Sequence, residues 1–216
     1  MSAARLDGKA CAADLEKRLK QRIANCSVQP HLAVIIVGDD PASHVYVNNK
    51  IRSCERLGIR STHVALPEDT DESVVADYIQ SMNQQNDLHG ILIQSPLPKH
   101  MNEEVLTELI DPRKDVDGFH PINVGNLSSG NDAMIPCTPL GCYYLIKKVI
   151  PNLSGLNAVV IGRSNINGKP MAQLLLKENC TVTIVHSKTN NIEEICKNAD
   201  LIIAAVGKAI MVKSNW

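Results

Sequence analysis

Apolar residues along this chain fall into two patterns that alternate from one end to the other. Short continuous runs such as 32–37 (LAVIIV) and 158–161 (AVVI) are rich in β-branched residues, as is typical of buried strands. Between these runs, apolar residues recur three and four positions apart, which predicts amphipathic helices. The pattern predicts strands over 32–37, 62–66, 90–93, 158–161, 181–185 and one ending near 205, and helices over 8–25, 41–57, 72–83, 102–109, 139–149 and after 168. Residues 111–139, rich in Gly, Pro, Asn and Ser, are predicted to be loop.

Strands that alternate with helices predict parallel sheets, because a parallel neighbour needs a crossover connection. The loop-rich stretch separates two such α/β regions, and we place the domain boundary near 136–141. The expected fold class is therefore α/β, with two domains over 1–138 and 139–216.

The composition excludes several classes of protein. Of the 216 residues, 44% are hydrophobic and the net charge is −1, so a folded core is expected and a nucleic-acid partner is not. No stretch approaches the ~18 consecutive apolar residues of a membrane helix. The N-terminal residues carry charges where a signal peptide needs apolar ones. Seven cysteines without CxxC pairing predict free thiols in the cytoplasm, and the dispersed histidines predict no metal site.

One segment, 158–187, has the order strand, glycine turn, helix, strand that binds dinucleotides. Gly162 lets the chain turn sharply, a later glycine lets the helix approach the sheet, and N–H groups at the helix start can hold a phosphate. The G-x-G-x-x-G spacing is absent, so the glycines alone are weak evidence. The second domain is nevertheless predicted to be a Rossmann-like dinucleotide-binding domain.

The end of the second strand in that segment favours NADP over NAD. NAD-selective enzymes place Asp or Glu there to bind the ribose 2′-hydroxyl, but this chain has His186, Ser187 and Lys188. Arg163, just past the first strand, can meet a 2′-phosphate with its guanidinium fork. The alternative is that Arg163 is a solvated turn residue and Ser187 an ordinary loop hydroxyl.

The helix over 41–57 carries a candidate catalytic lysine. Asp40 as N-cap and Gly58 as terminating glycine define its ends. Tyr46 and Lys50 lie four residues apart and so share a face that borders the apolar stripe. Partial burial disfavours a charged ammonium, so Lys50 is expected to act as a neutral amine. The alternative is an exposed lysine whose stem lies along the surface.

Two further polar residues follow predicted strands or lie in loops. Gln94 ends the strand over 90–93 and opens the loop QSPLP, and ligands of parallel sheets bind at such carboxyl ends. Asp117 lies in the long loop, where a carboxylate can accept hydrogen bonds from adjacent N–H groups of a ligand. The alternatives are an ordinary turn at Gln94 and a solvated acidic turn at Asp117.

Five motifs in register resemble one enzyme family. They are SHVYVNNKIRSCERLGI, GILIQSPLP, KDVDGFHPINVGNL, PCTP and GRSNINGKPMAQLLL. In this order they resemble the bifunctional methylenetetrahydrofolate dehydrogenase/methenyltetrahydrofolate cyclohydrolase family, over the chain as far as about Trp216.

The resemblance implies roles for the candidate residues. Lys50 would be the catalytic lysine, Gln94 the glutamine that positions it, and Tyr46 a tyrosine of the catalytic group that stacks on the folate. Asp117 would bind the pterin ring. The implied cofactor contacts are Gly162, Arg163, Ser164 and Ser187, and the implied cofactor is NADP. The resemblance also implies tetrahydrofolate derivatives as substrates, a cleft between the domains and a homodimer.

The activity implied is oxidation of 5,10-methylenetetrahydrofolate with NADP, followed by hydrolysis of the methenyl product to 10-formyltetrahydrofolate. Two alternatives stay open: another two-domain NADP dehydrogenase, similar to shikimate dehydrogenase, and an inactive nucleotide-binding fragment. Ser95 and Asn167 depart from the residues common in the family, leucine and an apolar residue.

Family members also continue past the end of this chain with a strand, a glycine-rich loop and a helix. On the sequence alone we expect the second domain to be cut short, and such a chain to be less stable and less active than an extended one.

Overall fold

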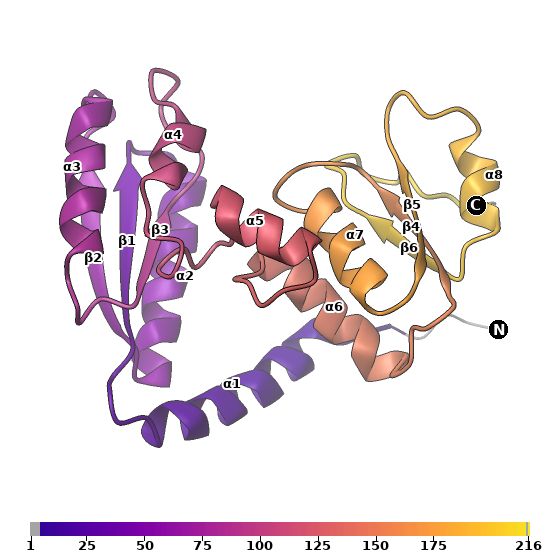
Figure 1. Ribbon diagram of the computed structural model, residues 1–216, viewed down its shortest axis with the longest axis horizontal. Coiled ribbons are helices and arrows are strands. Elements are labelled where there is room, and N and C mark those ends of the chain that lie inside the picture. The colour runs from indigo at the N-terminus through magenta and orange to yellow at the C-terminus, as the bar shows by residue number, and fades with distance from the viewer. Residues whose placement is uncertain (1–4, 215) are drawn as a thin grey trace. The chain divides into compact units, whose positions relative to one another are not determined.

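The computed structural model describes residues 5–214 and 216, which form two compact units, each with its own sheet. The first unit ends at Val116 and the second begins at Asp117. Figure 1 labels the helices and strands. No helix in the described part of the chain is long and apolar enough to cross a membrane.

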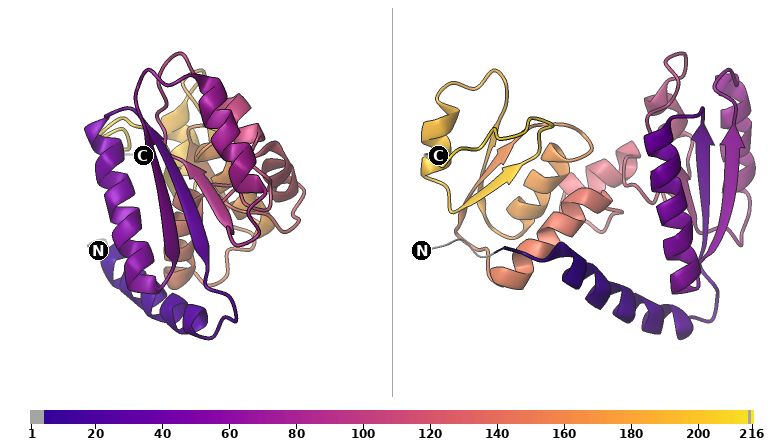
Figure 2. Two further views of the ribbon diagram at one scale, coloured as in Figure 1. Left: turned by 90° about the vertical axis from the view of Figure 1, so that its left-hand side faces the viewer. Right: turned by 180° about the vertical axis from the view of Figure 1, so that it is seen from behind.

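The first unit is a parallel sheet in the order β2-β1-β3, with helices on both faces. The strands are β1 (His31–Val37), β2 (Arg60–Leu66) and β3 (Gly90–Ile93), and the helices are α1 (Gly8–Ala24), α2 (Pro41–Leu57), α3 (Glu72–Asn83) and α4 (Glu103–Glu108). Successive side chains of β1 point to opposite faces, so Ile35 packs towards α3 and α4 while Val34 packs towards α2. Both faces of β1 are therefore buried, as the run LAVIIV predicts (Figure 2).

The expected ends of α2 are confirmed. The carboxylate of Asp40 accepts the backbone N–H of Ser43 at 2.8 Å, and Pro41 is the first helical residue. Gly58 ends the helix in the left-handed conformation, with φ 79°, which a glycine adopts without steric cost. These local signals fix which side chains of α2 face the sheet.

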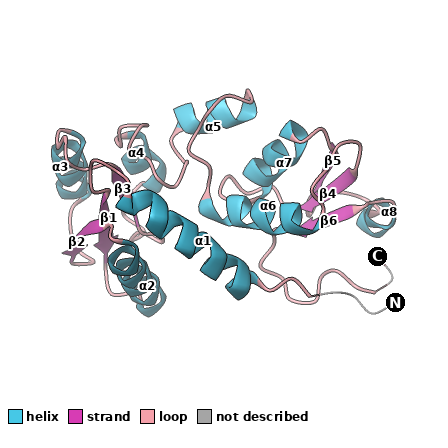
Figure 3. Cartoon of the chain, turned by 90° about the horizontal axis from the view of Figure 1, so that it is seen from below, coloured by secondary structure: helices cyan, strands magenta, loops and turns pink. Residues whose placement is uncertain are grey.

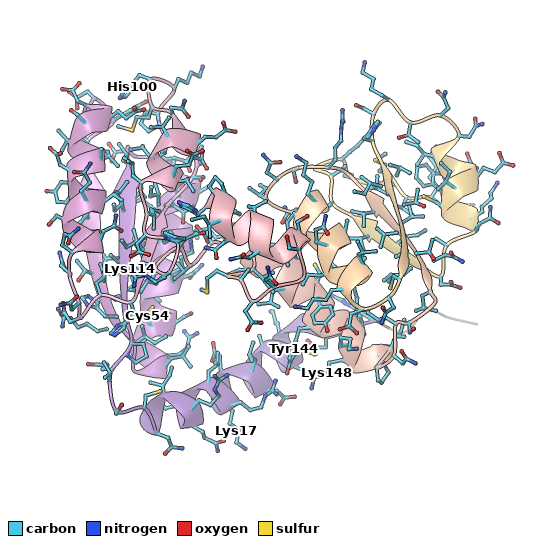
Figure 4. The ribbon with its side chains drawn as sticks, viewed as in Figure 1. Lys17, Cys54, His100, Lys114, Tyr144 and Lys148 are labelled. Carbon is cyan, nitrogen blue, oxygen red and sulfur yellow. The ribbon has the colours of Figure 1, made fainter. Side chains whose placement is uncertain are left out.

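Residues 114–116 extend the first sheet beyond β3. The N–H of Ile91 donates to the carbonyl of Lys114 at 2.7 Å, and Ile91 pairs with Asp115 in a parallel bridge. The ammonium of Lys114, labelled in Figure 4, donates to the carbonyls of Met82, Asn83 and Gln85 at 3.1, 2.8 and 2.8 Å. It thereby satisfies carbonyls at the C-terminal end of α3 and holds this segment in place.

The second unit repeats the layered plan with strand order β5-β4-β6, all parallel. Its strands are β4 (Asn157–Ile161), β5 (Thr181–Val185) and β6 (Leu201–Ala204), and its helices are α5 (Pro121–Ser128), α6 (Cys137–Val149), α7 (Gly168–Lys177) and α8 (Ile192–Lys197). Val160 packs against α6 and α7 on one face, and Val159 packs against α8 on the other (Figure 3). The predicted Rossmann-like strand, helix, strand unit is confirmed.

The prediction of loop over 111–139 is wrong in part, because α5 lies within it. Pro121 is the first residue of α5, and the ring nitrogen Nδ1 of His120 accepts the N–H of Ile122 at 3.1 Å. Histidine is not a usual N-cap, and Gly125 weakens the helical pattern, so the sequence conceals this helix. Helix α8, which we did not predict, begins after Asn191 and has acidic residues in its first turn.

The packing groups residues 117–138 with the second unit, since α5 contacts α7. The boundary at 138/139 that we placed from the sequence remains a proposal.

A half-buried carboxylate joins α6 to the end of α7. Glu178 accepts the hydroxyl of Tyr143 and the ammonium of Lys147, each at 2.6 Å. The bond from Lys147, and after it the bond from Tyr143, lower the pKa of the Glu178 carboxyl. Burial and the bond to Glu178 raise the pKa of Tyr143 to about 12.

We expect Glu178→Gln to lower the free energy of unfolding at pH 7 by about 1 kcal/mol, because an amide offers only one acceptor oxygen to two donors. A carboxyl whose pKa is lowered by folding stabilises the fold above its unfolded pKa, and this contribution is lost as pH falls through the folded pKa. The difference in stability between wild type and variant, measured by thermal melts, should therefore be present at pH 7 and smaller at pH 3.

The matched control for this prediction is Glu193→Gln, which alters an exposed pair with Lys197 at 3.6 Å. That variant should change stability little at either pH. An equal loss from both variants at pH 7 would contradict a specific role for Glu178.

Candidate functional site

The topology of each unit marks where a ligand can bind. In the first unit the chain leaves the central strand β1 for β2 on one side, then crosses to β3 on the other. Ligands of open parallel sheets bind outside the carboxyl ends of the strands at such a reversal, here between β1 and β3. The residues that follow these strands are 38–40 and 94–95. The same reversal lies between β4 and β6 in the second unit.

At the first reversal the structure brings two of the predicted residues together. The ammonium nitrogen of Lys50 donates to Oε1 of Gln94 at 2.9 Å, although 44 residues separate them. Lys50 is half-buried, and its neighbours Val47 and Cys54 on α2 face the core. Tyr46 lies one turn earlier on α2 and is 63% exposed, so its ring is accessible to a ligand.

Gln94 is held at both ends of its amide. Its Nε2 donates to the carbonyl of Ser95 at 2.7 Å while its Oε1 accepts from Lys50. A backbone carbonyl can only accept, so the bond to Ser95 places the NH₂ group of the amide on that side and its oxygen towards Lys50. Gln94 therefore presents an oxygen, not an NH₂ group, to the lysine.

Four residues of this network, Asp40, Ser43, Ser95 and Glu103, were not among our sequence predictions for the site. The buried hydroxyl of Ser43 donates to Oδ2 of Asp40 at 2.8 Å and lies 3.5 Å from the carbonyl oxygen of Ser95. The N–H and the hydroxyl of Ser43 lower the pKa of the Asp40 carboxyl. The hydroxyl of Ser95 donates to Oε1 of Glu103 at 2.5 Å. The sequence indicated Asp40 only as a helix cap, and nothing in the sequence pointed to Ser43 or Glu103 as part of a site.

Asp117 directly follows the segment that extends the first sheet. Its neighbour Val116 packs on the α2 face of that sheet, and Asp117 itself is half-buried with Gly118 next in a left-handed conformation. By packing Asp117 belongs to the second unit, so its role towards a ligand of the first unit stays a prediction.

In the second unit, two glycines make the turn after β4 possible. Gly162 has φ 114°, and a Cβ on it would collide with the carbonyl oxygen of Ala205, just after β6. A Cβ on Gly168 would collide with the carbonyl oxygen of Gly162. The turn is therefore closed tightly on itself. The sharp turn expected at Gly162 is confirmed, and Gly168 lets the start of α7 lie against the turn.

Ser164 closes this turn with its side chain. Its hydroxyl accepts the N–H groups of Asn167 and Gly168 at 3.2 and 3.3 Å, and its carbonyl accepts that of Lys169 at 3.1 Å. We expected N–H groups at this helix start to face a phosphate, but these three already bond to Ser164. The hydroxyl still has its own hydrogen to donate to an anion. Arg163 is exposed beside it.

Ser187 lies in a tight turn after β5. The carbonyl of His186 accepts the N–H of Thr189 at 2.8 Å, and Nδ1 of His186 accepts the N–H of Lys188 at 3.2 Å. Both bonds fold the turn around Ser187, which is exposed together with Lys188. The turn offers a hydroxyl and an ammonium, and its residues 186–189 include no carboxylate.

Two family models match this chain. Residues 6–117 match the catalytic domain of tetrahydrofolate dehydrogenase/cyclohydrolase, and residues 136–216 match the NAD(P)-binding domain of the same enzyme.

Individual relatives agree with the family models. The chain is 57% identical to the bifunctional protein FolD of Anaplasma phagocytophilum (strain HZ), over 98% of this chain and 71% of that protein. It is 54% identical to the bifunctional protein FolD of Ehrlichia canis (strain Jake), over 100% of this chain and 74% of that protein.

Solved structures show the same likeness. The bifunctional enzyme FolD, a methylenetetrahydrofolate dehydrogenase/cyclohydrolase from Campylobacter jejuni, superimposes with a TM-score of 0.94 at 43% identity, covering 97% of this chain and 76% of that one. The dehydrogenase-cyclohydrolase of Trypanosoma brucei, complexed with NADP and an inhibitor, gives a TM-score of 0.90 at 32% identity, covering 96% and 73%. With both domain models matched and identities above one half, this chain belongs to the tetrahydrofolate dehydrogenase/cyclohydrolase family.

Proposed function

We propose that this protein oxidises 5,10-methylenetetrahydrofolate with NADP and hydrolyses the 5,10-methenyl product to 10-formyltetrahydrofolate. The observation that carries the proposal is the bond between Lys50 and Gln94 at the strand reversal of the first unit. It places an orientated amine at the carboxyl edge of the sheet, in a chain of the family that performs this chemistry.

In the dehydrogenase step the protein mainly has to position the folate and the cofactor. The carbon between N5 and N10 of the folate loses a hydride and becomes part of an amidinium cation, and no proton transfer is needed at that carbon. We propose that Tyr46 stacks its exposed ring on the folate and that Asp117 accepts hydrogen bonds from the pterin. A carboxylate suits that ring because the pterin presents adjacent N–H groups.

The cyclohydrolase step needs a proton acceptor. Water adds to the cationic methenyl carbon and loses one proton, which leaves a hydroxyl on that carbon. The bond from the carbon to N5 then breaks as N5 takes up a proton, and the hydroxyl releases its own proton to solvent as it becomes the formyl carbonyl. We propose that the neutral amine of Lys50 accepts the proton from water and that the resulting ammonium returns one to N5. A cationic substrate repels an ammonium and so favours the neutral amine before water adds.

NADP fits the turn after β4. When bound, NADP would supply the nicotinamide ring as the hydride acceptor. The absence of a Cβ at Gly162 and Gly168 allows this turn to close tightly, and the Ser164 hydroxyl retains a hydrogen for a phosphate oxygen. We propose that Arg163 and Ser187 hold the 2′-phosphate, since both are exposed cationic or donor groups without a neighbouring carboxylate in their own turns.

Arg163→Ala is expected to lower the preference for NADP over NAD roughly ten- to hundredfold, because a hydrogen bond to a charged group contributes about 1.5–3 kcal/mol. Steady-state kcat/KM with each cofactor measures the preference. Arg113→Ala, which removes an exposed arginine of the first unit, is the matched control and should leave the ratio unchanged. Equal use of NAD and NADP by the wild type would contradict this assignment.

A spectrophotometric assay with methylenetetrahydrofolate and NADP tests the function as a whole. Formation of NADPH and of the methenyl chromophore, followed by its decay, supports both steps. A chain that binds NADP but turns over no folate is the inactive nucleotide-binding alternative. We also propose a homodimer in the cytoplasm, and light scattering on the purified protein tests the dimer.

A further inference from the structure

The loop that carries Gln94 is anchored by a side-chain bond to α4. Ser95, the next residue, donates its hydroxyl to Oε1 of Glu103 at 2.5 Å. Glu103 is the first residue of α4, which packs on the α3 face of the sheet, whereas Lys50 comes from α2 on the opposite face. A hydroxyl bonded to an ionised carboxylate is short and about twice as strong as a neutral pair, so this contact is suited to fixing a loop.

Ser95 also supplies the acceptor that holds the amide of Gln94. Nε2 of Gln94 donates to the Ser95 carbonyl at 2.7 Å, and that carbonyl also lies 3.5 Å from the hydroxyl of Ser43. The bonds form one path, from Glu103 through Ser95 to Gln94 and from Gln94 to Lys50. If Ser95 shifts, the amide loses the partner that fixes its orientation, and the lysine loses its acceptor.

We infer that Ser95 and Glu103 are positioning residues that hold Gln94, and through it the amine of Lys50, in the geometry for proton transfer. The inference rests on the proposed function, because it concerns the step that Lys50 performs there. Neither residue needs to touch the folate. The dehydrogenase step depends less on this path, since the proposed hydride transfer moves no proton to Lys50.

The first test compares Ser95→Ala, Glu103→Ala and Ser95→Thr in the full chain. Without the hydroxyl or the carboxylate, kcat for methenyltetrahydrofolate hydrolysis should fall roughly tenfold at a nearly unchanged KM, because orientation is lost and binding is not. Dehydrogenase kcat should fall less than about threefold by the same argument. Ser95→Thr keeps a hydroxyl and should retain most of the hydrolytic rate.

The second test determines whether Ser95 affects hydrolysis by way of Gln94. Adding Ser95→Ala to Gln94→Ala should reduce hydrolysis no further, whereas a general disturbance of the loop would reduce it again. Glu72→Gln is the matched control, because Glu72 accepts the N–H of Asn102 at 2.5 Å and so also restrains the start of α4, without contacting Ser95. It should leave both activities unchanged, and thermal melts should show all variants folded.

The outcomes separate this inference from the function that it assumes. A wild type that lacks hydrolysis overturns the proposed function and the inference with it. An active wild type whose Ser95→Ala and Glu103→Ala variants keep full hydrolytic kcat overturns the inference alone. The inference is also overturned if these variants reduce both activities equally. It is overturned as well if Ser95→Ala reduces hydrolysis further when added to Gln94→Ala.

Discussion

Replacing Lys50 by methionine is expected to reduce hydrolysis of methenyltetrahydrofolate by about 10²–10⁴-fold, the usual cost of losing a positioned proton-transfer group. Methionine keeps an unbranched, flexible side chain beside the buried Val47, so packing on α2 should change little. The oxygen of Gln94 would lose its donor at 2.9 Å. Dehydrogenase activity should fall much less, because hydride transfer depends on placement of the two reactants.

The two activities are measured on the same preparation, from NADPH formation and from decay of the methenyl absorbance. Lys17→Met, on the polar helix α1 that has no buried residue, is the control for loss of one positive charge (Figure 4). It should leave both rates unchanged. Hydrolysis by Lys50→Met at the wild-type rate would show that another group accepts the proton.

Gly168→Ala is expected to have the largest effect on the second unit. Its Cβ would meet the backbone of Gly162 and Arg163, and backbone atoms cannot move aside as a flexible side chain can. We expect a loss of about 1–3 kcal/mol in the free energy of unfolding, as for other overpacked sites. NADP affinity should fall at least roughly tenfold, because the turn must open. Denaturant unfolding and cofactor titration measure the two effects.

Gly141 provides the matched control for that substitution. It lies within α6, and a Cβ there would meet nothing within 4 Å. Gly141→Ala should stabilise the protein by about 0.5–1 kcal/mol, since alanine loses less backbone freedom in a helix. If Gly168→Ala were as well tolerated as this control, the tight closure of the turn would not matter for binding.

The elements that the sequence predicts correctly are those with strong local signals. The Asp40 cap and the terminating Gly58 place α2 to the residue, and the β-branched runs identify every strand. The close turn after β4 was predicted from glycines placed between a strand and a helix, and the collisions that a Cβ would make at Gly162 and Gly168 explain why glycine is needed there. The helix ends and the contact between Gly168 and Gly162 depend on neighbours in the chain, so a single sequence contains that information; the contact between Gly162 and Ala205 depends on the fold.

The parts that the sequence conceals depend on distant partners. The pairing of Lys50 with Gln94 was implied by the family resemblance, but the residues alone do not indicate it, because the bond requires β1 and β3 to be adjacent in the sheet. Ser43 is unremarkable in sequence until the fold buries it beside the carbonyl of Ser95. Helix α5 was missed because an imidazole caps it, and local propensity does not anticipate that acceptor.

The closure of the α7 turn by Ser164 restricts what evolution or design can place at that position. Alanine would leave the N–H groups of Asn167 and Gly168 without their acceptor. Aspartate would accept both N–H groups but would set a negative charge where we place an anionic ligand. A hydroxyl accepts from the helix and donates outward through one small atom, so threonine should be the best tolerated replacement at 164.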